Sequence, residues 1–396
     1  MRLFLISVFV TILAVPELAE VAAMPAEAPI PTAEATTPAA AAETPPGRVG
    51  RLSLVFGNVS VRASGEWLDA LLNFPVAAGA SLRTGAQARA EIEIGADTIE
   101  LAPESEIDIT KLDDRAIQVA VIGGRIGFAL RRLGYGESVE VEMSREGVRL
   151  LQPGRYDIDA STRRIAVSAG GALSAGSDPT DATIQPAAGD DFVEWCRSRD
   201  YDEMRLAAPY YVSPYMTGFA ELDMAGTWES TAEYGAVWVP TGLPPDWAPY
   251  RDGHWRWIVP WGWTWIDDQP WGFAPSHYGR WAFVGERWIW APGKFVEHPE
   301  YMPAVVAFLG TRGVGLSVAD STSPGIGWFP LAPGEAYWPS YSRNPAYARR
   351  LNQGDVSDLE TIQLDANGEP PLEVVDRHFA NRRFASVVPR PVFVNG

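Results

Sequence analysis

Residues 88–101 read Ala-Arg-Ala-Glu-Ile-Glu-Ile-Gly-Ala-Asp-Thr-Ile-Glu-Leu, and this stretch decides the fold class. Apolar and polar side chains alternate on both sides of a Gly-Ala-Asp break, which is the period of a β strand with one buried face. The same period occurs at residues 59–61, 117–121, 139–141 and 165–167, with no long helical pattern between them. We therefore predict a mainly β fold, with an antiparallel sandwich or roll over residues 49–171 that folds on its own.

The N-terminus has the composition of an export signal. Arg2 precedes an apolar run at residues 3–15, and small residues follow up to Ala23. The run is shorter than the roughly 20 residues that a membrane-spanning helix needs. We therefore predict a signal peptide over residues 1–23 that is cleaved near Ala23, with a retained anchor as the alternative. Residues 24–48 are rich in Ala and Pro, which predicts a disordered linker.

Composition also divides the rest of the chain. A Gly/Ser/Asp/Pro-rich linker is expected over residues 172–190, followed by a short helix that begins behind Asp190. Fourteen of the sixteen tryptophans lie between residues 228 and 338. This enrichment assigns residues 191–345 to a second, Trp/Tyr/Gly/Pro-rich β domain. Residues 346–396 are polar and interrupted by proline, so we predict an irregular C-terminal tail.

Three Trp-x-Trp pairs predict the architecture of the second domain. Because side chains alternate along a strand, each pair places two indoles on one face. Turn residues separate the pairs and predict consecutive hairpins in a small β meander with an aromatic face. The pairs are Trp255 and Trp257, Trp263 and Trp265, and Trp288 and Trp290, and the turns are Asp252-Gly253, Trp261-Gly262 and Gly285-Glu286.

The overall charge and the rare residue types exclude several functions. The chain has 50 Asp and Glu against 32 Lys and Arg, a net charge of −18, which disfavours nucleic acid and anionic lipid as partners. Its single cysteine, Cys196, allows no internal disulfide. Four scattered histidines show no metal-ligand spacing, and no glycine-rich phosphate loop is present. We therefore expect neither a metal nor a cofactor.

Asp267 and Asp268 are the best candidates for catalytic residues. Paired carboxylates in an aromatic cleft are the machinery of glycoside hydrolases. However, Asp267-Asp268-Gln269-Pro270 follows a Trp-rich strand and has the composition of a turn. We therefore expect no catalytic residues and no enzyme, and keep a carbohydrate-active enzyme that uses these two residues as a less favoured alternative.

Two resemblances to known families are carried by longer motifs. Residues 50–170 resemble a FecR-type domain through Gly79-x-x-Leu82-Arg-Thr-Gly85, Gly123-Gly124-Arg125-Ile126 and Gly154-x-Tyr156-x-Ile158. The second domain resembles the Trp/Tyr-rich proteobacterial family called domain of unknown function 6600. The motifs are Gly226-x-Trp228, Val237-Trp238-x-Pro240, Trp261-Gly262-Trp263-Thr264-Trp265, His277-Tyr278-Gly279-Arg280-Trp281 and Trp328-Phe329-Pro330-Leu331. The resemblances imply an exported protein of the periplasm or envelope of a Gram-negative bacterium, and they assign no activity.

The tryptophans suggest a binding surface. Indole faces stack on sugar rings and dominate protein contacts, and glycines beside the strand face leave room for a partner. We predict a non-catalytic binding or interaction module for peptidoglycan, another envelope polysaccharide or an envelope protein. The alternative is a structural or scaffolding envelope protein whose aromatic residues form only the core. Exposure of the tryptophans would favour the first function and burial the second. The predicted groove consists of Trp263, Trp265, Trp271, His277, Tyr278, Arg280 and Trp281.

Overall fold

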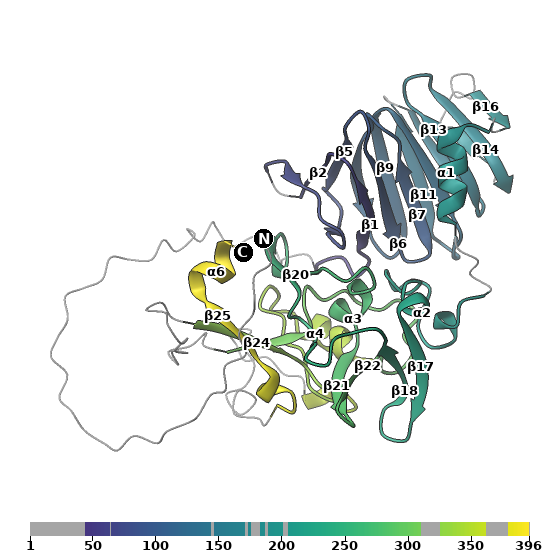
Figure 1. Ribbon diagram of the computed structural model, residues 1–396. Helices are drawn as coiled ribbons and strands as arrows, with labels where there is room; N and C mark the ends of the chain where they lie inside the picture. Colours follow the sequence, from purple (N-terminus) through teal and green to yellow (C-terminus); the bar gives the residue numbers. More distant parts are fainter. Residues whose placement is uncertain are drawn as a thin grey trace, which may run out of the picture.

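The structure is a computed structural model and is mainly β, with 41% strand and 14% helix. It describes residues 44–63, 65–143, 146–170, 173–175, 183–186, 189–200, 205–309, 325–361 and 379–395. The predicted signal peptide and most of the predicted N-terminal linker lie outside these residues. A β sandwich occupies the upper right of Figure 1, and the Trp-rich half lies below it.

Two eight-stranded sheets form the sandwich. The first sheet has the strand order β16-β14-β13-β10-β7-β6-β1-β4, and the second has the order β15-β12-β11-β9-β8-β5-β2-β3. Neighbouring strands are antiparallel except for the pairs β9–β11 and β14–β16. The strands are β1 (Gly50–Phe56), β2 (Val59–Arg62), β3 (Leu68–Asp69), β4 (Pro75–Val76), β5 (Ser81–Thr84), β6 (Arg89–Ile94), β7 (Asp97–Leu101), β8 (Glu106–Leu112), β9 (Ala116–Gly123), β10 (Arg125–Leu130), β11 (Ser138–Met143), β12 (Glu146–Leu150), β13 (Gly154–Asp159), β14 (Arg164–Gly170), β15 (Leu173–Ala175) and β16 (Thr183–Pro186).

The first sheet is covered on both faces. Its inner face contributes aliphatic side chains such as Ile92 and Ile99 to the core. The alternate residues of β6 and β7 point the other way and include Glu91, Glu93 and Glu100, and these carboxylates are buried as well. The strand period therefore predicts which face a side chain takes, whereas burial depends on what packs over that face.

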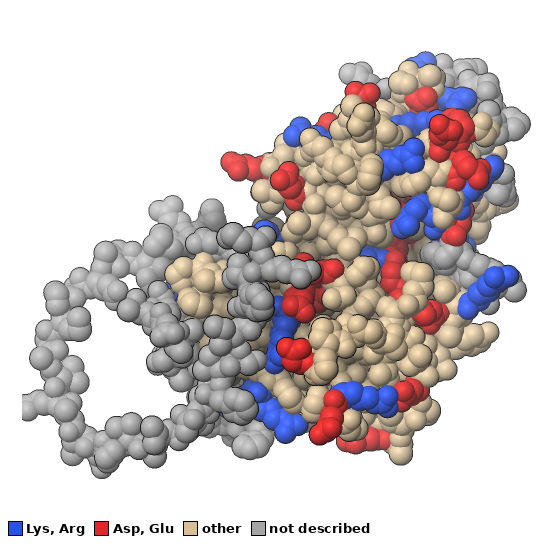
Figure 2. All heavy atoms as spheres, viewed as in Figure 1, with Lys and Arg blue, Asp and Glu red and all other residues tan. Residues whose placement is uncertain are grey.

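Helix α1 (Asp191–Arg199) lies along the first sheet (Figure 1). The side chain of Asp190 accepts hydrogen bonds from the backbone N–H groups of Phe192 and Val193 at 3.1 and 3.0 Å. The predicted helix start is thereby confirmed. Arg199 donates through two guanidinium nitrogens to Glu91, each at 2.9 Å. Basic and acidic side chains are interspersed over this side of the sandwich in Figure 2. Both the ion pair of Arg199 and the apolar contacts of Phe192 and Cys196 therefore join the helix to the sheet.

The Trp-rich half contains three small sheets instead of one continuous meander. The first is β17-β18-β22-β21, the second is the hairpin β19-β20, and the third is β23-β24-β25. The strands are β17 (Gly226–Thr231), β18 (Gly235–Pro240), β19 (Gly253–Ile258), β20 (Gly262–Asp267), β21 (Arg280–Val284), β22 (Arg287–Ala291), β23 (Val306–Leu309), β24 (Gly325–Pro330) and β25 (Ser386–Pro389). The short helices are η2 (Ala208–Tyr210), α2 (Leu222–Ala225), α3 (Phe273–His277), α4 (Pro345–Asn352), η3 (Leu359–Thr361), η4 (Arg382–Phe384) and α6 (Arg390–Asn395).

Two of the three expected hairpins form, β19-β20 and β21-β22, whereas the Asp252-Gly253 turn follows a loop after β18 and joins no pair of strands. At the Gly285-Glu286 turn both residues have positive φ, 57° and 62°, which is the geometry of a two-residue turn between antiparallel strands. In β19-β20, Trp255 pairs with Trp265 and Trp257 pairs with Trp263. Four indoles therefore share one face of this hairpin, as the strand period predicts.

Two segments that the sequence predicted as irregular contain regular structure. The linker at 172–190 holds β15 and β16, and the tail at 346–396 contains most of α4 together with β25 and α6. Strand β25 lies at the edge of its sheet and ends at Pro389, where the missing N–H of proline is tolerated. Phe393 of α6 is buried against Trp255 at a ring-centroid distance of 5.4 Å. Proline content therefore underestimated the order of this tail, which covers part of the aromatic core.

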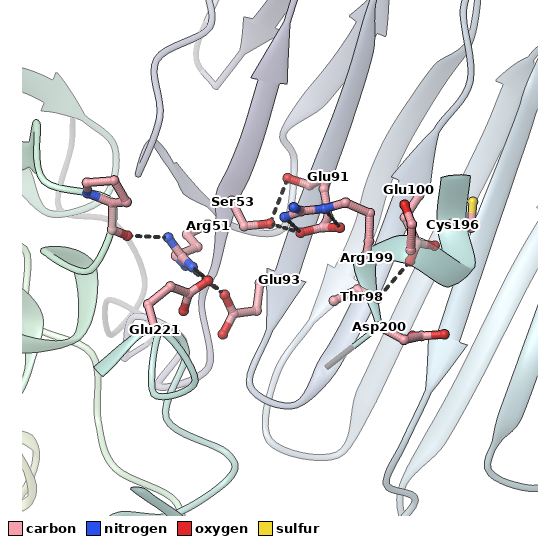
Figure 3. A network of polar contacts seen from close by, with 12 residues as sticks. Arg51, Ser53, Glu91, Glu93, Thr98, Glu100, Cys196, Arg199, Asp200 and Glu221 are labelled. Atoms are coloured by element: carbon pink, nitrogen blue, oxygen red, sulfur yellow. Dashed lines mark hydrogen bonds and ion pairs between the residues drawn. The ribbon is translucent and has the colours of Figure 1, made fainter. Parts of the chain in front are cut away.

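A buried arginine joins the two halves. Arg51 of β1 is 1% exposed, and its Nε donates to Glu93 at 2.7 Å. On the other side it forms an ion pair with Glu221 and donates to the carbonyl oxygen of Pro270 at 3.1 Å. Figure 3 shows Arg51 between these two glutamates. The guanidinium of Arg51 thus forms ion pairs with two carboxylates from different halves of the chain.

An asparagine makes a second polar connection. The side-chain amide of Asn73, in the sandwich, donates to the carbonyl oxygens of Asp267 at 2.8 Å and Gln269 at 2.7 Å. Thr217 of the Trp-rich half supplies a side-chain contact to the sandwich, because its hydroxyl accepts a hydrogen bond from the backbone N–H of Gly95 at 2.9 Å. A single cluster of buried apolar residues also extends through both halves. The sandwich and the Trp-rich half therefore share one continuous core.

Candidate functional site

The structure buries most of the predicted aromatic groove. Trp265, Trp271, Tyr278 and Trp281 are between 1 and 7% exposed, and Trp263 is half-buried. An open row of indoles, which the sequence analysis predicted for a ligand, is therefore not formed by these residues. Sequence alternation placed the side chains on common faces, but those faces turn toward the core.

Hydrogen bonds hold the buried indoles in place. Trp265 donates through Nε1 to the carboxylate of Asp267 at 2.9 Å, and Trp281 donates to the carbonyl oxygen of Pro275 at 3.0 Å. A buried indole N–H needs such an acceptor, since leaving it unpaired costs about 1 to 3 kcal/mol. These tryptophans therefore contribute to the packing of the loops that supply the acceptors.

His277 is also part of the core. The ring is fully buried, and its Nδ1 lies 2.7 Å from the carbonyl oxygen of Met302. Since a carbonyl can only accept, Nδ1 carries the proton and donates. Burial lowers the pKa of His277 to about 3, so the imidazole stays neutral near pH 7.

Arg280 occupies a comparable position among buried acceptors. Its Nε donates to the carbonyl oxygen of Glu335 at 3.0 Å, and its Nη2 donates to the side chain of Asn352 at 2.8 Å. The guanidinium also forms an ion pair with Asp355 at 3.2 Å. With these partners inside the protein, Arg280 fixes the C-terminal end of α4 against the start of β21.

Asp267 and Asp268 lie in different environments. Asp267 is buried at the end of β20, where its carboxylate accepts hydrogen bonds from Trp265 and from the backbone of Gln269. Burial raises the pKa of Asp267 to about 7. Asp268 is exposed and lies 3.1 Å from the imidazole of His254. The hydrogen bonds of Asp267 are structural, and the two carboxyl groups do not face a common cleft.

A shallow pocket opens at another place in the Trp-rich half. Its cavity volume is about 40 Å³, so it is a depression in the surface and not a deep cleft. Tyr278 lies in its floor, while the exposed rings of Tyr211 and Phe295 stand at its rim. Tyr211 is held by stacking on Trp228, with ring centroids 4.5 Å apart and planes inclined by 19°. Four segments line the pocket: residues 211–216, 278–279, 292–302 and 350–355.

The charged groups of this pocket are largely paired with one another. Arg350 forms an ion pair with Glu300, and Asp355 pairs with the buried Arg280. Burial raises the pKa of both Glu300 and Asp355 above the ordinary range. Lys294 is exposed beside the rim. The pocket therefore combines aromatic contact area with fixed charges, an arrangement suited to contact with a partner.

In the part of the chain that the structure describes, no group of three or more His, Cys, Asp or Glu side chains is placed to hold a metal ion. Within those same residues, no helix is long and apolar enough to cross a membrane.

Comparison with known proteins gives one match. Residues 219–335 match the model of a family of unknown function, DUF6600. This match agrees with the resemblance carried by the Trp-rich motifs. No curated protein and no solved structure matches the chain.

The DUF6600 region includes the strands from β17 to β24 and the buried aromatic residues between them. It supplies Tyr278 and Phe295 to the pocket, whereas Tyr211 precedes the region and Asp355 follows it. The predicted groove included Tyr278 but neither Tyr211 nor Phe295. Neither belongs to a Trp-x-Trp pair, and only folding brings the two residues together.

Proposed function

We propose that the protein is a non-catalytic, exported interaction module of the bacterial cell envelope that binds a glycan or a protein partner at the pocket between Tyr211 and Phe295. The observation that carries this proposal is the exposure of these two rings beside a pocket whose walls belong to a packed core. The ring of Tyr211 is held by its stacking on Trp228, so it can bind a partner with little loss of side-chain entropy.

The envelope location rests on the sequence. The charged, apolar and small-residue regions of residues 1–23 occur in the order of a signal peptide. The FecR-like motifs of residues 50–170 add the expectation of a periplasmic β domain in a Gram-negative bacterium. Intact-mass analysis of the protein from a periplasmic fraction tests this part, and a membrane-bound form that retains Met1 would contradict cleavage.

The binding proposal is tested by a pull-down of the mature protein against peptidoglycan, envelope polysaccharides and envelope extract. Replacing Tyr211 and Phe295 with alanine should weaken capture by about 1 to 3 kcal/mol, the range of interface hot spots. Phe56→Ala is the matched control, because Phe56 is 64% exposed on β1 of the sandwich. Equal capture by the pocket variants and by the control would remove the pocket from the proposal.

The scaffold alternative is favoured by a separate observation, the burial of Trp265, Trp271 and Trp281 in the core. If the aromatic residues serve stability alone, the pocket variants retain every partner, whereas core variants unfold. A carbohydrate-active enzyme based on Asp267 and Asp268 is less favoured, because the Asp267 carboxylate is buried in structural hydrogen bonds.

A further inference from the structure

An apolar surface is exposed at one end of the Trp-rich half. It consists of Trp257 and Val259 from the β19-β20 hairpin, Phe308 from β23, and Val392 and Val394 from α6. We call it the hairpin-end surface. Trp257 is 63% exposed and Val259 is 55% exposed, at the end of the hairpin where the chain turns. Two of the three elements come from distant parts of the sequence and meet only in the fold.

The surface is continuous, because Phe393 connects its parts. The buried ring of Phe393 lies 4.7 Å from the ring of Trp263 and 6.1 Å from that of Phe308, measured between centroids. Trp263 in turn contacts Trp257 at 5.6 Å. The exposed side chains therefore surround one packed aromatic centre, and the surface is presented on a rigid base.

The charge of this end differs from the charge of the whole chain. The segments 253–263, 305–309, 325–330 and 386–394 contain Arg256 and Arg390 and no Asp or Glu. This absence occurs in a chain whose net charge is −18. These segments therefore contribute no carboxylate beside the exposed apolar side chains.

We propose that the hairpin-end surface docks on a lipid surface that contains anionic headgroups. Trp and Val side chains at a hairpin end suit the boundary between headgroups and acyl chains. Arg390 is exposed beside them and suits a lipid phosphate. The proposal goes beyond partner binding at the pocket and uses different residues.

Other occupants fit this surface less well. A second copy of the chain would present the same segments, which contain no Asp or Glu to pair with Arg390. A glycan would need several hydrogen-bonding side chains, whereas Trp257, Val259 and Val392 offer only one indole N–H among them. The net charge alone disfavours anionic lipid, but that figure averages over a surface on which acidic residues are unevenly placed.

The test is flotation of the full-length mature protein with phosphatidylcholine vesicles prepared with and without phosphatidylglycerol. Binding should require phosphatidylglycerol and weaken as salt is raised. Val259→Asp should reduce vesicle binding about tenfold or more, because it places a charge at the inserting end. Trp257→Ala should also weaken binding. Both positions are exposed, so melting temperatures should remain near that of the parent protein.

Two matched controls make the outcome decisive. Val284→Asp places the same charge on the exposed end of the other hairpin, and Phe295→Ala removes an exposed ring at the pocket. Both should float with vesicles as the parent protein does. Failure of the parent protein to float, equal loss in Val259→Asp and Val284→Asp, or binding without phosphatidylglycerol would each overturn the proposal. A halving of the molar mass of Val259→Asp in light scattering would instead identify a second copy as the occupant.

Discussion

The two halves of the molecule build their cores from different side chains. The sandwich core consists mainly of Val, Ile, Leu and Ala, whereas the core of the Trp-rich half contains nine buried tryptophans. Aliphatic side chains place no hydrogen-bonding group in a core. An indole carries one N–H, and five of these nine tryptophans donate it inside the protein: Trp238, Trp265, Trp281, Trp290 and Trp328. Within the described residues, the buried N–H groups of Trp255 and Trp261 have no hydrogen-bond partner.

The acceptors come largely from loops and short helices. Trp238 donates to the carbonyl oxygen of Leu222 at 2.8 Å, and Trp328 donates to that of Tyr250 at 2.9 Å. In the sandwich, regular strand pairing satisfies the backbone and the core only fills space. In the Trp-rich half, the core side chains themselves fix the path of irregular backbone. A small domain with short strands can be held together in this way.

Separating the two halves should give the largest change in stability. A fragment of residues 44–200, which contains the sandwich and α1, should remain rich in strand and melt well below the full chain. It loses Glu221 and the Pro270 carbonyl as partners of Arg51, a cost of about 3 kcal/mol or more. Thermal melts followed by circular dichroism measure the difference. A fragment that melts like the full chain would show that the sandwich folds alone, as strand alternation by itself predicts.

Within the Trp-rich half, two tryptophans on the same face of one hairpin provide a matched pair. Trp265→Ala should cost about 3 to 5 kcal/mol, because it leaves a large cavity and removes a donor from Asp267. Trp257→Ala should cost about 1 kcal/mol or less, since Trp257 is 63% exposed. Urea denaturation measures both free energies of unfolding. Equal costs would mean that burial does not distinguish the two indoles.

At the polar junction between the halves, removing one charged partner should destabilise the chain more than removing all of them. Arg51→Met should destabilise the full chain by about 3 to 4 kcal/mol, because it leaves Glu93 buried without its main cation. Replacing Arg51, Glu93 and Glu221 together should recover most of that loss. Arg149→Met is the control, since its pair with Glu140 is exposed and worth about 1 kcal/mol or less. A triple variant as unstable as Arg51→Met would contradict this account.

The smallest expected effect is the pH dependence, which differs between the halves. Burial raises the pKa of Glu93 and Glu100 in the sandwich to about 7. Their folded forms bind protons more readily than the unfolded chain does, so their stabilising contribution is complete below about pH 4.5 and is lost as the pH rises through 7. In the Trp-rich half, burial also raises the pKa of Asp267 to about 7, and this carboxyl acts in the same sense. The lowered pKa of His277 acts in the opposite sense, with a contribution lost as the pH falls from 6.5 toward 3.

Urea denaturation between pH 5 and 8 measures this dependence in the full chain. In the parent protein the free energy of unfolding should decline as the pH rises. Glu100→Gln should reduce this decline by on the order of 1 to 3 kcal/mol, because one titrating carboxyl is removed. One oxygen of Glu100 is buried without a hydrogen-bond partner, so the glutamine is expected to be tolerated. An unchanged slope in Glu100→Gln would contradict the raised pKa.

Local patterns predicted local structure well. The Asp190 cap, the Gly285-Glu286 turn and the shared face of Trp255 and Trp257 all follow from short-range geometry. Burial was harder to predict, because it depends on segments distant in the sequence. Glu91 alternates with apolar residues and resembles a solvent-facing side chain, yet α1 covers it. A strand period shows which residues share a face and says nothing about what packs on that face.

The candidate site illustrates the same limit. Tyr278 was recognised in an aromatic motif, but the rim residues Tyr211 and Phe295 stand 84 positions apart in the chain. The exposed hairpin-end surface depends equally on α6, in a tail expected to be irregular. Long-range packing of this kind leaves no periodic signal in the sequence.

The junction around Arg51 also constrains how the gene can diversify. A recombination event that joined this sandwich to another C-terminal half would leave a guanidinium and a carboxylate enclosed without Glu221. The side-chain amide of Asn73 would likewise lose the two carbonyl groups that accept its hydrogen bonds. Such a chimera would be eliminated by instability before its binding properties could be selected. The two halves are therefore expected to be inherited as a unit, with Arg51, Asn73 and Glu221 changing together or not at all.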